Sequence, residues 1–403
     1  MSFSLPERVT LKGPNFIREV FERGVGVEGF ISFGIGNPAP EAIPVEIIEK
    51  AFDEVVHSNP MSLLQYGPMQ GDARLAELTL DRLVKAHKMN PEGQGLIISN
   101  GAGQLLGLVP ITVLEPGDEV YMDEFTFTSA INSVRNMGGK ALGIKTDEYG
   151  MIPSELEKAA QSGKGKYIYL IPNFQNPTGI TMPLERRKEI YAIASKYDLF
   201  IYEDDPYGDL LYMDTPALPK IKSFDASGHV IYAGSFSKIL APGSRLGFLL
   251  APKPVFQKLV LVKQVADSFA NLYWQYLASQ LIEDDEFNAH IAYLKQLYQV
   301  KMAAMVTALQ QYGSEYLSFV APDGGYFVSV KLNDDIDPTV FYDELDRRHV
   351  GVIPGNIMSA AGQGYDQYFR LNFTLPTPET ITEGVKRIAA AAAAAKIPQQ
   401  VEV

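Results

Sequence analysis

The 403-residue chain contains no cysteine, one tryptophan and only five histidines. The lack of cysteine excludes disulfide bonds and thiolate metal sites and suits a reducing cytosol, so we expect a cytoplasmic protein. No apolar run reaches the length of a membrane-spanning helix. The first residues also lack the basic-then-apolar order of a signal peptide. The sequence therefore predicts no membrane partner.

Positive charge is in deficit. The 35 Lys and Arg residues face 48 Asp and Glu residues, which gives a formal net charge of −13 and a pI near 5.0. This balance argues against nucleic acid or an anionic membrane surface as the main partner. A small anionic ligand can still bind, because a local basic pocket can outweigh the overall field.

The chain is longer than one ordinary core, so two domains are expected. Its middle alternates strand and helix patterns, as in residues 166–172, 182–198 and 199–205. Such alternation builds a mostly parallel sheet covered by helices on both faces. A long helical pattern opens near residue 285, two strands follow, and a last helix begins after Thr377 as its N-cap. These flanking parts predict a small second domain, built from the C-terminal part and an N-terminal arm.

Ligands of such sheets bind at the carboxyl ends of strands, so the residues that follow each apolar run carry the information. After the run at 95–99 comes "NGAGQLLGL", where glycines open a helix and can form an anion site. After the run at 166–172 comes "NFQNPTG", which places the Asn176 amide as a hydrogen-bond donor. Taken alone, each pattern is more typical of a plain turn that enters a helix than of a ligand site.

The next strand ends in "EDDPYGDL", residues 203–210. Three acids could form a metal site, but no histidine lies nearby, and we expect no metal. An unpaired buried charge is costly. A carboxylate that leaves a buried strand therefore indicates a buried cationic partner.

The stretch "SFSKILAPGSRLG", residues 235–247, places Lys238 among apolar neighbours. Burial lowers the pKa of an amine, and a neutral amine attacks carbonyls to form Schiff bases. Arg245 suits a fork-like grip on a phosphate or carboxylate, and Ser235 and Ser237 add hydroxyls. The alternative is an ordinary surface lysine that buries only its stem.

Together the four strand ends offer an anion cradle, an amide donor, a carboxylate, and a lysine with an arginine. These four parts match the groups of pyridoxal 5'-phosphate. The cradle suits the phosphate, the amide the phenolic oxygen, the carboxylate the pyridine nitrogen and the lysine the aldehyde. The ordered set "NPTG", "EDDPYGDL", "SFSKILAPGSRLG" and "RLNF" also resembles the class I/II aminotransferases, fold-type I pyridoxal-phosphate enzymes. The similarity covers nearly the whole chain and is strongest to the 2-aminoadipate, kynurenine and aromatic aminotransferase branch.

The resemblance implies an α/β fold of fold type I. It has a mostly parallel seven-stranded sheet sandwiched by helices, plus a smaller α+β domain. The expected parts are residues 1–45 as the N-terminal arm with part of the small domain, 46–290 as the large cofactor-binding domain, and 291–403 as the C-terminal small domain.

The resemblance also implies roles for individual residues. Catalytic roles fall on Lys238, which would join the cofactor aldehyde and shuttle a proton, on Asp204 at the pyridinium nitrogen, and on Tyr207. The implied cofactor contacts are Tyr66, Ala102, Gly103, Phe127, Asn176, Asp204, Tyr207, Ser235, Ser237, Lys238 and Arg245. Family members usually carry Ser at position 102 and Tyr at 127, so one phosphate hydrogen bond and one ring hydrogen bond are expected to be lost.

On the substrate side, the resemblance implies that Arg370 clamps the α-carboxylate, with Gly36 and Asn176 beside it. Arg18 would meet a side-chain carboxylate, although an exposed helix arginine is the plainer interpretation. Tyr66 matches a tyrosine that reaches the phosphate of the other subunit, so we expect a homodimer with shared active sites.

The implied activity is transfer of the amino group of an L-amino acid, aromatic, aminoadipate or similar, to a 2-oxo acid such as 2-oxoglutarate, with ping-pong kinetics. Two alternatives remain. A carbon–sulfur β-lyase would use the same four strand ends. A non-catalytic effector module of a transcription regulator would share the fold, and the acidic charge balance argues against DNA binding.

Overall fold

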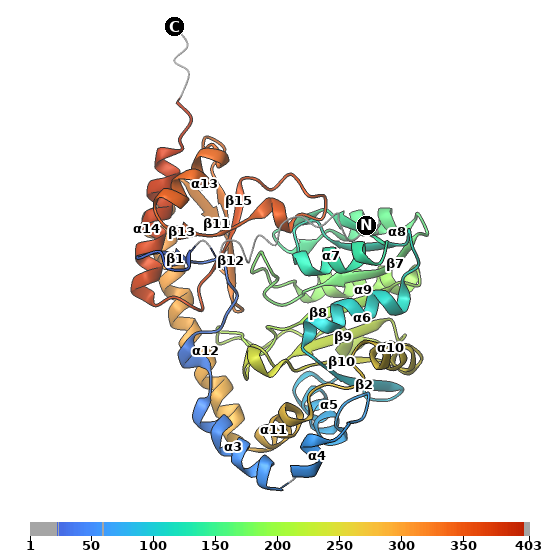
Figure 1. Ribbon diagram of the computed structural model, residues 1–403. Helices are drawn as coiled ribbons and strands as arrows, with labels where there is room; N and C mark the ends of the chain where they lie inside the picture. Colours follow the sequence, from blue (N-terminus) through green and yellow to red (C-terminus); the bar gives the residue numbers. More distant parts are fainter. Residues whose placement is uncertain (1–21, 23, 59, 399–403) are drawn as a thin grey trace, which may run out of the picture.

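The computed structural model describes residues 22, 24–58 and 60–398 (Figure 1). A seven-stranded sheet forms its centre. Only β10 runs antiparallel to its neighbours, and the other adjacent pairs are parallel, which confirms the expected mostly parallel sheet. In order across the sheet the strands are β2 (Gln94–Ser99), β10 (Gly247–Pro252), β9 (Val230–Ser235), β8 (Phe200–Asp205), β7 (Gly165–Leu170), β3 (Glu119–Asp123) and β4 (Lys140–Ile144).

Helices cover both faces of this sheet (Figure 1). The central strands are buried on both sides and are rich in Tyr, Ile, Val and Leu, as a parallel sheet covered by helices requires. One face packs against α6 (Ala102–Val113), α7 (Thr128–Asn136) and α10 (Lys253–Ala266). The opposite face packs against α5 (Ala73–His87), α8 (Pro153–Ala160) and α9 (Leu184–Lys196).

A second, antiparallel sheet lies beside the first and is covered by the C-terminal helices (Figure 1). Thr377 caps the last helix through the backbone N–H of Thr380, as the sequence predicted. The strands in order are β11 (Leu317–Phe319), β12 (Phe327–Leu332), β15 (Tyr368–Asn372) and β14 (Ile353–Pro354). The helices are α12 (Asp285–Ala308), α13 (Pro338–Arg347) and α14 (Pro378–Ala394).

The early chain joins this second part. Strand β1 (Ile31–Ser32) pairs in parallel with β13 (Val350–Gly351), so the N-terminal segment lies against C-terminal residues. The expected boundary at residue 290 falls inside the continuous helix α12, and the three domain boundaries stay a prediction.

The remaining elements connect these layers, and no helix in the described part of the chain is long and apolar enough to cross a membrane. They are η1 (Pro40–Ala42), α3 (Val45–Ser58), α4 (Pro60–Leu64), β5 (Thr146–Asp147), β6 (Gly150–Met151), η2 (Ile221–Phe224), η3 (Pro242–Ser244), α11 (Leu272–Glu283), the π-helical η4 (Leu309–Gly313) and η5 (Gly355–Met358).

Candidate active site

The strand ends enclose a cavity of about 320 Å³ between the two sheets. Its walls combine the start of α6, the ends of β8 and β9, the loop after β7, and residues of β12 and β15. Twelve of the residues singled out from the sequence line this one cavity: Gly36, Ala102, Gly103, Phe127, Asn176, Asp204, Tyr207, Ser235, Ser237, Lys238, Arg245 and Arg370.

Lys238 follows the end of β9 and lies half-buried at the cavity wall. Its Nζ donates a hydrogen bond to the carbonyl oxygen of Gly36 at 2.7 Å and lies 4.9 Å from the centre of the Tyr326 ring. Burial, helped by the positive charges of Arg370 and Arg245, lowers the Lys238 pKa to about 8. A sizeable fraction of this amine is therefore neutral, and thus nucleophilic, near neutral pH.

Asp204 is the buried carboxylate at the end of β8. Its Oδ2 accepts a hydrogen bond from the Tyr169 hydroxyl at 2.7 Å, whereas Oδ1 has no partner among the residues that the structure describes. Burial raises the Asp204 pKa to about 7, and the charge of Asp205 adds to the effect. A buried, unpartnered carboxylate oxygen at a cavity wall fits a cationic N–H group.

The first turn of α6 forms an anion cradle. Its N-cap, Gly101, has φ 79° and no side chain to cap the helix, so the first backbone N–H groups remain open to a ligand. The positive φ at position 101 favours glycine, and a Cβ there would lie 2.5 Å from Arg245 Nη2. Arg245 Nη2 donates to the Asn100 carbonyl at 3.3 Å, which brings the guanidinium beside the cradle.

A partly buried hydrogen-bond network supports this cradle, and no pattern in the sequence indicated it. Asn100 Nδ2 and Gln104 Nε2 both donate to Asp267 Oδ2, at 2.6 and 2.7 Å. Lys263 pairs with the same carboxylate at 2.8 Å. Because Asn100 and Gln104 flank the helix start, Asp267 fixes both sides of the turn that carries the open N–H groups.

Arg370 projects from β15 of the second sheet into the cavity wall. Its Nη1 and Nη2 donate to Asn176 Oδ1 and to the Gly34 carbonyl, at 2.8 and 2.6 Å, while Nε has no partner in the described chain. The guanidinium carbon stacks 4.1 Å from the centre of the Phe327 ring. Burial lowers the Arg370 pKa to about 10, so the group stays charged at neutral pH and suits a carboxylate.

Tyr207 and Phe127 complete the aromatic wall. Burial raises the Tyr207 pKa well above its ordinary value, so the hydroxyl stays protonated and can donate. Phe127 immediately precedes α7 and is half-buried, and its ring carries no hydroxyl.

Among the expected site residues that the structure describes, Tyr66 does not line the cavity. Tyr66 is 85% exposed and packs edge-on against Phe269, with ring centres 5.9 Å apart. Arg18 lies outside the described residues. In the described ranges, no group of three or more His, Cys, Asp or Glu side chains could hold a metal ion.

The three acids of β8 have separate partners. Glu203 accepts hydrogen bonds from the backbone N–H groups of Ile221 and Lys222, and Asp205 pairs with the buried Lys220 Nζ at 2.6 Å. The cationic partner expected for a buried acid therefore exists for Asp205, from a lysine that the sequence did not single out. The pattern "ALPK", an isolated Lys after a loop, carries no sign of this burial.

Known proteins share this architecture. The family model for aminotransferase class I and II matches residues 28–388. An aromatic-amino-acid aminotransferase of Thermococcus litoralis is 34% identical over 378 residues, which cover 93% of this chain and 90% of that protein. The solved structure of Pyrococcus horikoshii kynurenine aminotransferase, with PMP, gives a TM-score of 0.92 at 31% identity and 96% coverage of both chains. The chain belongs to the class I and II aminotransferases.

A protein of Bacillus subtilis named an HTH-type transcriptional regulator is also similar, at 28% identity over 89% of this chain and 73% of the regulator. Sequence similarity to this chain thus extends to a protein that is named as a regulator and not as an aminotransferase.

The aminotransferase uses pyridoxal phosphate, and its cavity fits that cofactor. The unpartnered oxygen of Asp204 suits a pyridinium N–H, and the open N–H groups of α6 with Arg245 suit a phosphate dianion. Lys238, with its lowered pKa, suits an aldehyde.

We predict that Asp204→Asn stabilises the apoprotein while weakening cofactor binding. A folded-state pKa of about 7, against the ordinary 3.8, means that ionising Asp204 costs the folded apoprotein up to ~4 kcal/mol. This cost is absent below pH 3.8, grows between pH 3.8 and 7, and is complete above pH 7. Urea unfolding of the apoprotein should therefore show a stability gain at pH 8 that disappears near pH 4.

Asp123→Asn is the matched control. Asp123 is also fully buried, with its pKa raised to about 7 by burial, and its Oδ1 has no partner among the described residues. It does not line the cavity. The control should gain stability with the same pH dependence but keep wild-type affinity for pyridoxal phosphate. Equal cofactor affinity in Asp204→Asn and Asp123→Asn would contradict the assignment of Asp204.

Proposed function

We propose that this aminotransferase moves the amino group of an aromatic, aminoadipate-like or similar L-amino acid to a 2-oxo acid such as 2-oxoglutarate, with ping-pong kinetics. The observation that supports it is that Lys238, Asp204 and Arg370 all line one cavity. The amine, the carboxylate and the guanidinium address three different groups: an aldehyde, a pyridinium and a substrate carboxylate.

In this proposal the cofactor is held at four points. Lys238 supplies the amine for its aldehyde, and Asp204 Oδ1 accepts from its ring nitrogen. Asn176 Nδ2, which has no hydrogen bond within the described residues, and the Tyr207 hydroxyl donate to its phenolic oxygen. Its phosphate lies against the N–H groups of Ala102 and Gly103, the hydroxyls of Ser235 and Ser237, and Arg245, while Phe127 packs on its ring.

When bound, pyridoxal phosphate supplies an electron sink for the electron pair released as the substrate Cα–H bond breaks. Lys238 Nζ takes the proton from Cα, because its lowered pKa leaves more of the amine neutral near neutral pH than in an ordinary lysine. The Asp204 carboxylate keeps negative charge beside the ring nitrogen throughout. Asp204 is buried and Lys238 is half-buried, which limits the access of water to both groups.

Arg370 orients the amino acid. Its stacking on Phe327 and its hydrogen bonds to Asn176 and Gly34 hold the guanidinium in one plane before a substrate arrives. A carboxylate clamped in that plane places the Cα–H bond toward Lys238, which favours deprotonation over loss of the carboxylate. A contact between Arg18 and an acidic substrate side chain remains part of the proposal.

The test is a panel of amino donors mixed with 2-oxoglutarate. Phenylalanine, tyrosine, kynurenine or 2-aminoadipate should each bleach the cofactor absorbance in stopped flow, and the second substrate should restore it. Lys238→Ala should lose at least ~10³-fold in rate because both the amine and the proton acceptor are removed. The control is Lys188→Ala, an exposed lysine that pairs with Glu185, which should keep full activity.

Two outcomes would contradict this proposal. Release of ammonia and pyruvate from a cystathionine-like substrate, without transfer to 2-oxoglutarate, would favour the β-lyase alternative. Full activity of Lys238→Ala would remove the lysine from its assigned role.

The homodimer is a proposal that rests on an exposed apolar segment. Met61, Leu64 and Tyr66 are 73%, 84% and 85% exposed, and Val265 of α10 is 90% exposed. Tyr66 contacts Phe269, which follows α10, so these side chains belong to neighbouring segments. Contiguous exposed apolar groups of this size are typical of an interface. Tyr66 from one subunit would then reach the phosphate in the other.

Leu64→Glu should convert the dimer to a monomer in sedimentation velocity, because burying an unpaired carboxylate at an apolar interface is unfavourable. The monomer should lose pyridoxal phosphate on dialysis, since Tyr66 of a partner subunit would be absent. Val320→Glu, an exposed apolar position after β11, is the matched control and should remain dimeric. A wild-type protein that sediments as a monomer with bound cofactor would contradict the shared site.

A further inference from the structure

The strand β8 carries two buried acids that point away from the cavity. Side chains alternate along a strand, so Asp204 faces the cavity while Glu203 and Asp205 lie on the opposite face of the sheet. Burying a second carboxylate directly beside Asp204 is expensive unless it is paired. The structure therefore raises the question of what neutralises Asp205.

Asp205 is neutralised by Lys220. The two charged atoms are 2.6 Å apart, and the side chains of Lys220 and Asp205 are only 2% and 1% exposed. The carboxylate also accepts hydrogen bonds from Asn173 Nδ2 and from the Tyr232 hydroxyl, each at 2.8 Å. These donors favour the ionised form, and the pKa of Asp205 stays below its ordinary value despite burial, through Lys220 first among its partners.

The same ion pair supports the turn that carries Tyr207. A Cβ added to Gly208 would lie 2.2 Å from both Asp205 Oδ2 and Lys220 Nζ, so the backbone at position 208 rests directly on the pair. The two preceding residues, Pro206 and Tyr207, form part of the cavity wall. A shift of the ion pair would therefore move the Tyr207 hydroxyl.

Other charged groups surround the pair without replacing Lys220. Arg187 uses its guanidinium on the Pro219 and Pro172 carbonyls and on Asn173 Oδ1. Arg82 pairs with Asp209 at 2.7 Å. Burial, with the charge of Lys220, lowers the pKa of His87, so this ring is neutral at neutral pH.

Two further groups face Asp205. Glu203 is held by backbone N–H groups, and Tyr232 donates to Asp205. Within the described chain, Lys220 is thus the cation in ion-pair contact with the Asp205 carboxylate.

We propose that Lys220 is a positioning residue of the aminotransferase: it neutralises Asp205, so that Asp204 alone presents negative charge to the cofactor ring, and it seats the turn that carries Tyr207. The inference rests on the role proposed above for Asp204. Charge changes at either member of the pair should therefore be felt at the cofactor, although neither side chain lines the cavity.

The direction in which the pH midpoint of the cofactor absorbance moves distinguishes an electrostatic effect from a disrupted structure. Lys220→Met leaves Asp205 uncompensated and adds negative charge behind Asp204, which stabilises protonated groups on the bound cofactor. Asp205→Asn leaves Lys220 uncompensated and has the opposite effect. The pH midpoint of the cofactor absorbance should rise in the first variant and fall in the second, each by at least ~0.5 unit. The double variant Asp205→Asn/Lys220→Met should return to within about 0.2 unit of wild type.

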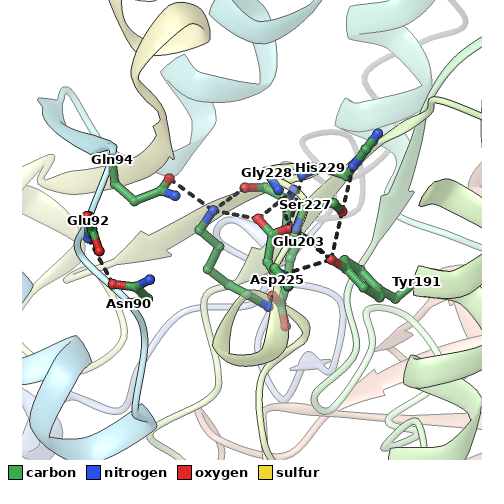
Figure 2. A network of polar contacts seen from close by, with 12 residues as sticks. Asn90, Glu92, Gln94, Tyr191, Glu203, Asp225, Ser227, Gly228 and His229 are labelled. Atoms are coloured by element: carbon green, nitrogen blue, oxygen red, sulfur yellow. Dashed lines mark hydrogen bonds and ion pairs between the residues drawn. The ribbon is translucent and has the colours of Figure 1, made fainter.

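A second buried lysine offers a matched control. Figure 2 shows the polar network around Asp225 and Glu203. Lys222 Nζ donates to Asp225 Oδ2, Gln94 Oε1 and the Val230 carbonyl. This pair is also buried, at 2.9 Å, but it lies at the start of β9 and away from the cavity. Lys222→Met/Asp225→Asn should lower the unfolding temperature without moving the absorbance midpoint.

Two measurements test the role of Lys220: absorbance titration of the holoenzymes from pH 5 to 9, and the rate at which an amino donor bleaches the cofactor. Lys220→Met should bleach about tenfold more slowly, and the double variant should recover most of that loss. If Lys220→Met does not fold, Asp205→Asn against the double variant still tests the sign. Shifts in the same direction in both single variants, or no shift, would overturn the inference.

Asp204→Asn separates the two proposals. If it leaves the absorbance midpoint unchanged, the proposed role of Asp204 fails. If it moves the midpoint while the Lys220 and Asp205 variants do not, only the present inference fails.

Discussion

The removal of the Lys238 ammonium from water is the constraint on which the rest of the site depends. An amine in this environment releases its proton readily, because neither solvent nor a carboxylate stabilises its charged form. Two arginines near it, Arg245 and Arg370, reinforce that preference. The same arginines suit phosphate and carboxylate groups, so the features that recruit anionic ligands also make the amine reactive.

The cavity therefore gathers charged groups whose burial costs the folded protein free energy. Asp204 is buried with one oxygen unpartnered, and Arg370 is buried with Nε unpartnered within the described chain. Each is destabilising until a ligand of opposite charge arrives. Cofactor and substrate binding thus relieve a cost already present in the apoprotein, which links affinity to stability.

The sequence was most informative where chemistry follows a strand. The seven-stranded sheet was predicted from alternating apolar runs together with the family resemblance, and the structure confirms it. Lys238, Asp204 and Asn176 were found because the carboxyl ends of neighbouring strands meet at one edge. Arg370 came from resemblance alone, since nothing in "YFRLNF" indicates which cavity the guanidinium enters.

The supporting contacts could not be predicted, because their partners are set by loops. Lys220 reaches Asp205 across an irregular segment, and Asp267, the residue that follows α10, reaches Asn100 just before α6. Tyr169 lies in a strand whose register decides its neighbour, and a single sequence does not fix the register. The predicted role of Arg18 stays a prediction, because this residue lies outside the described residues.

Arg370 contacts Gly34 and Asn176, so the carboxylate clamp is assembled from three segments far apart in the chain. Asn176 belongs to the loop after β7 of the large sheet and Arg370 to β15 of the small sheet, so the 2.8 Å bond between them joins the two sheets. A rotation of one sheet against the other would break this bond and change the direction of the guanidinium.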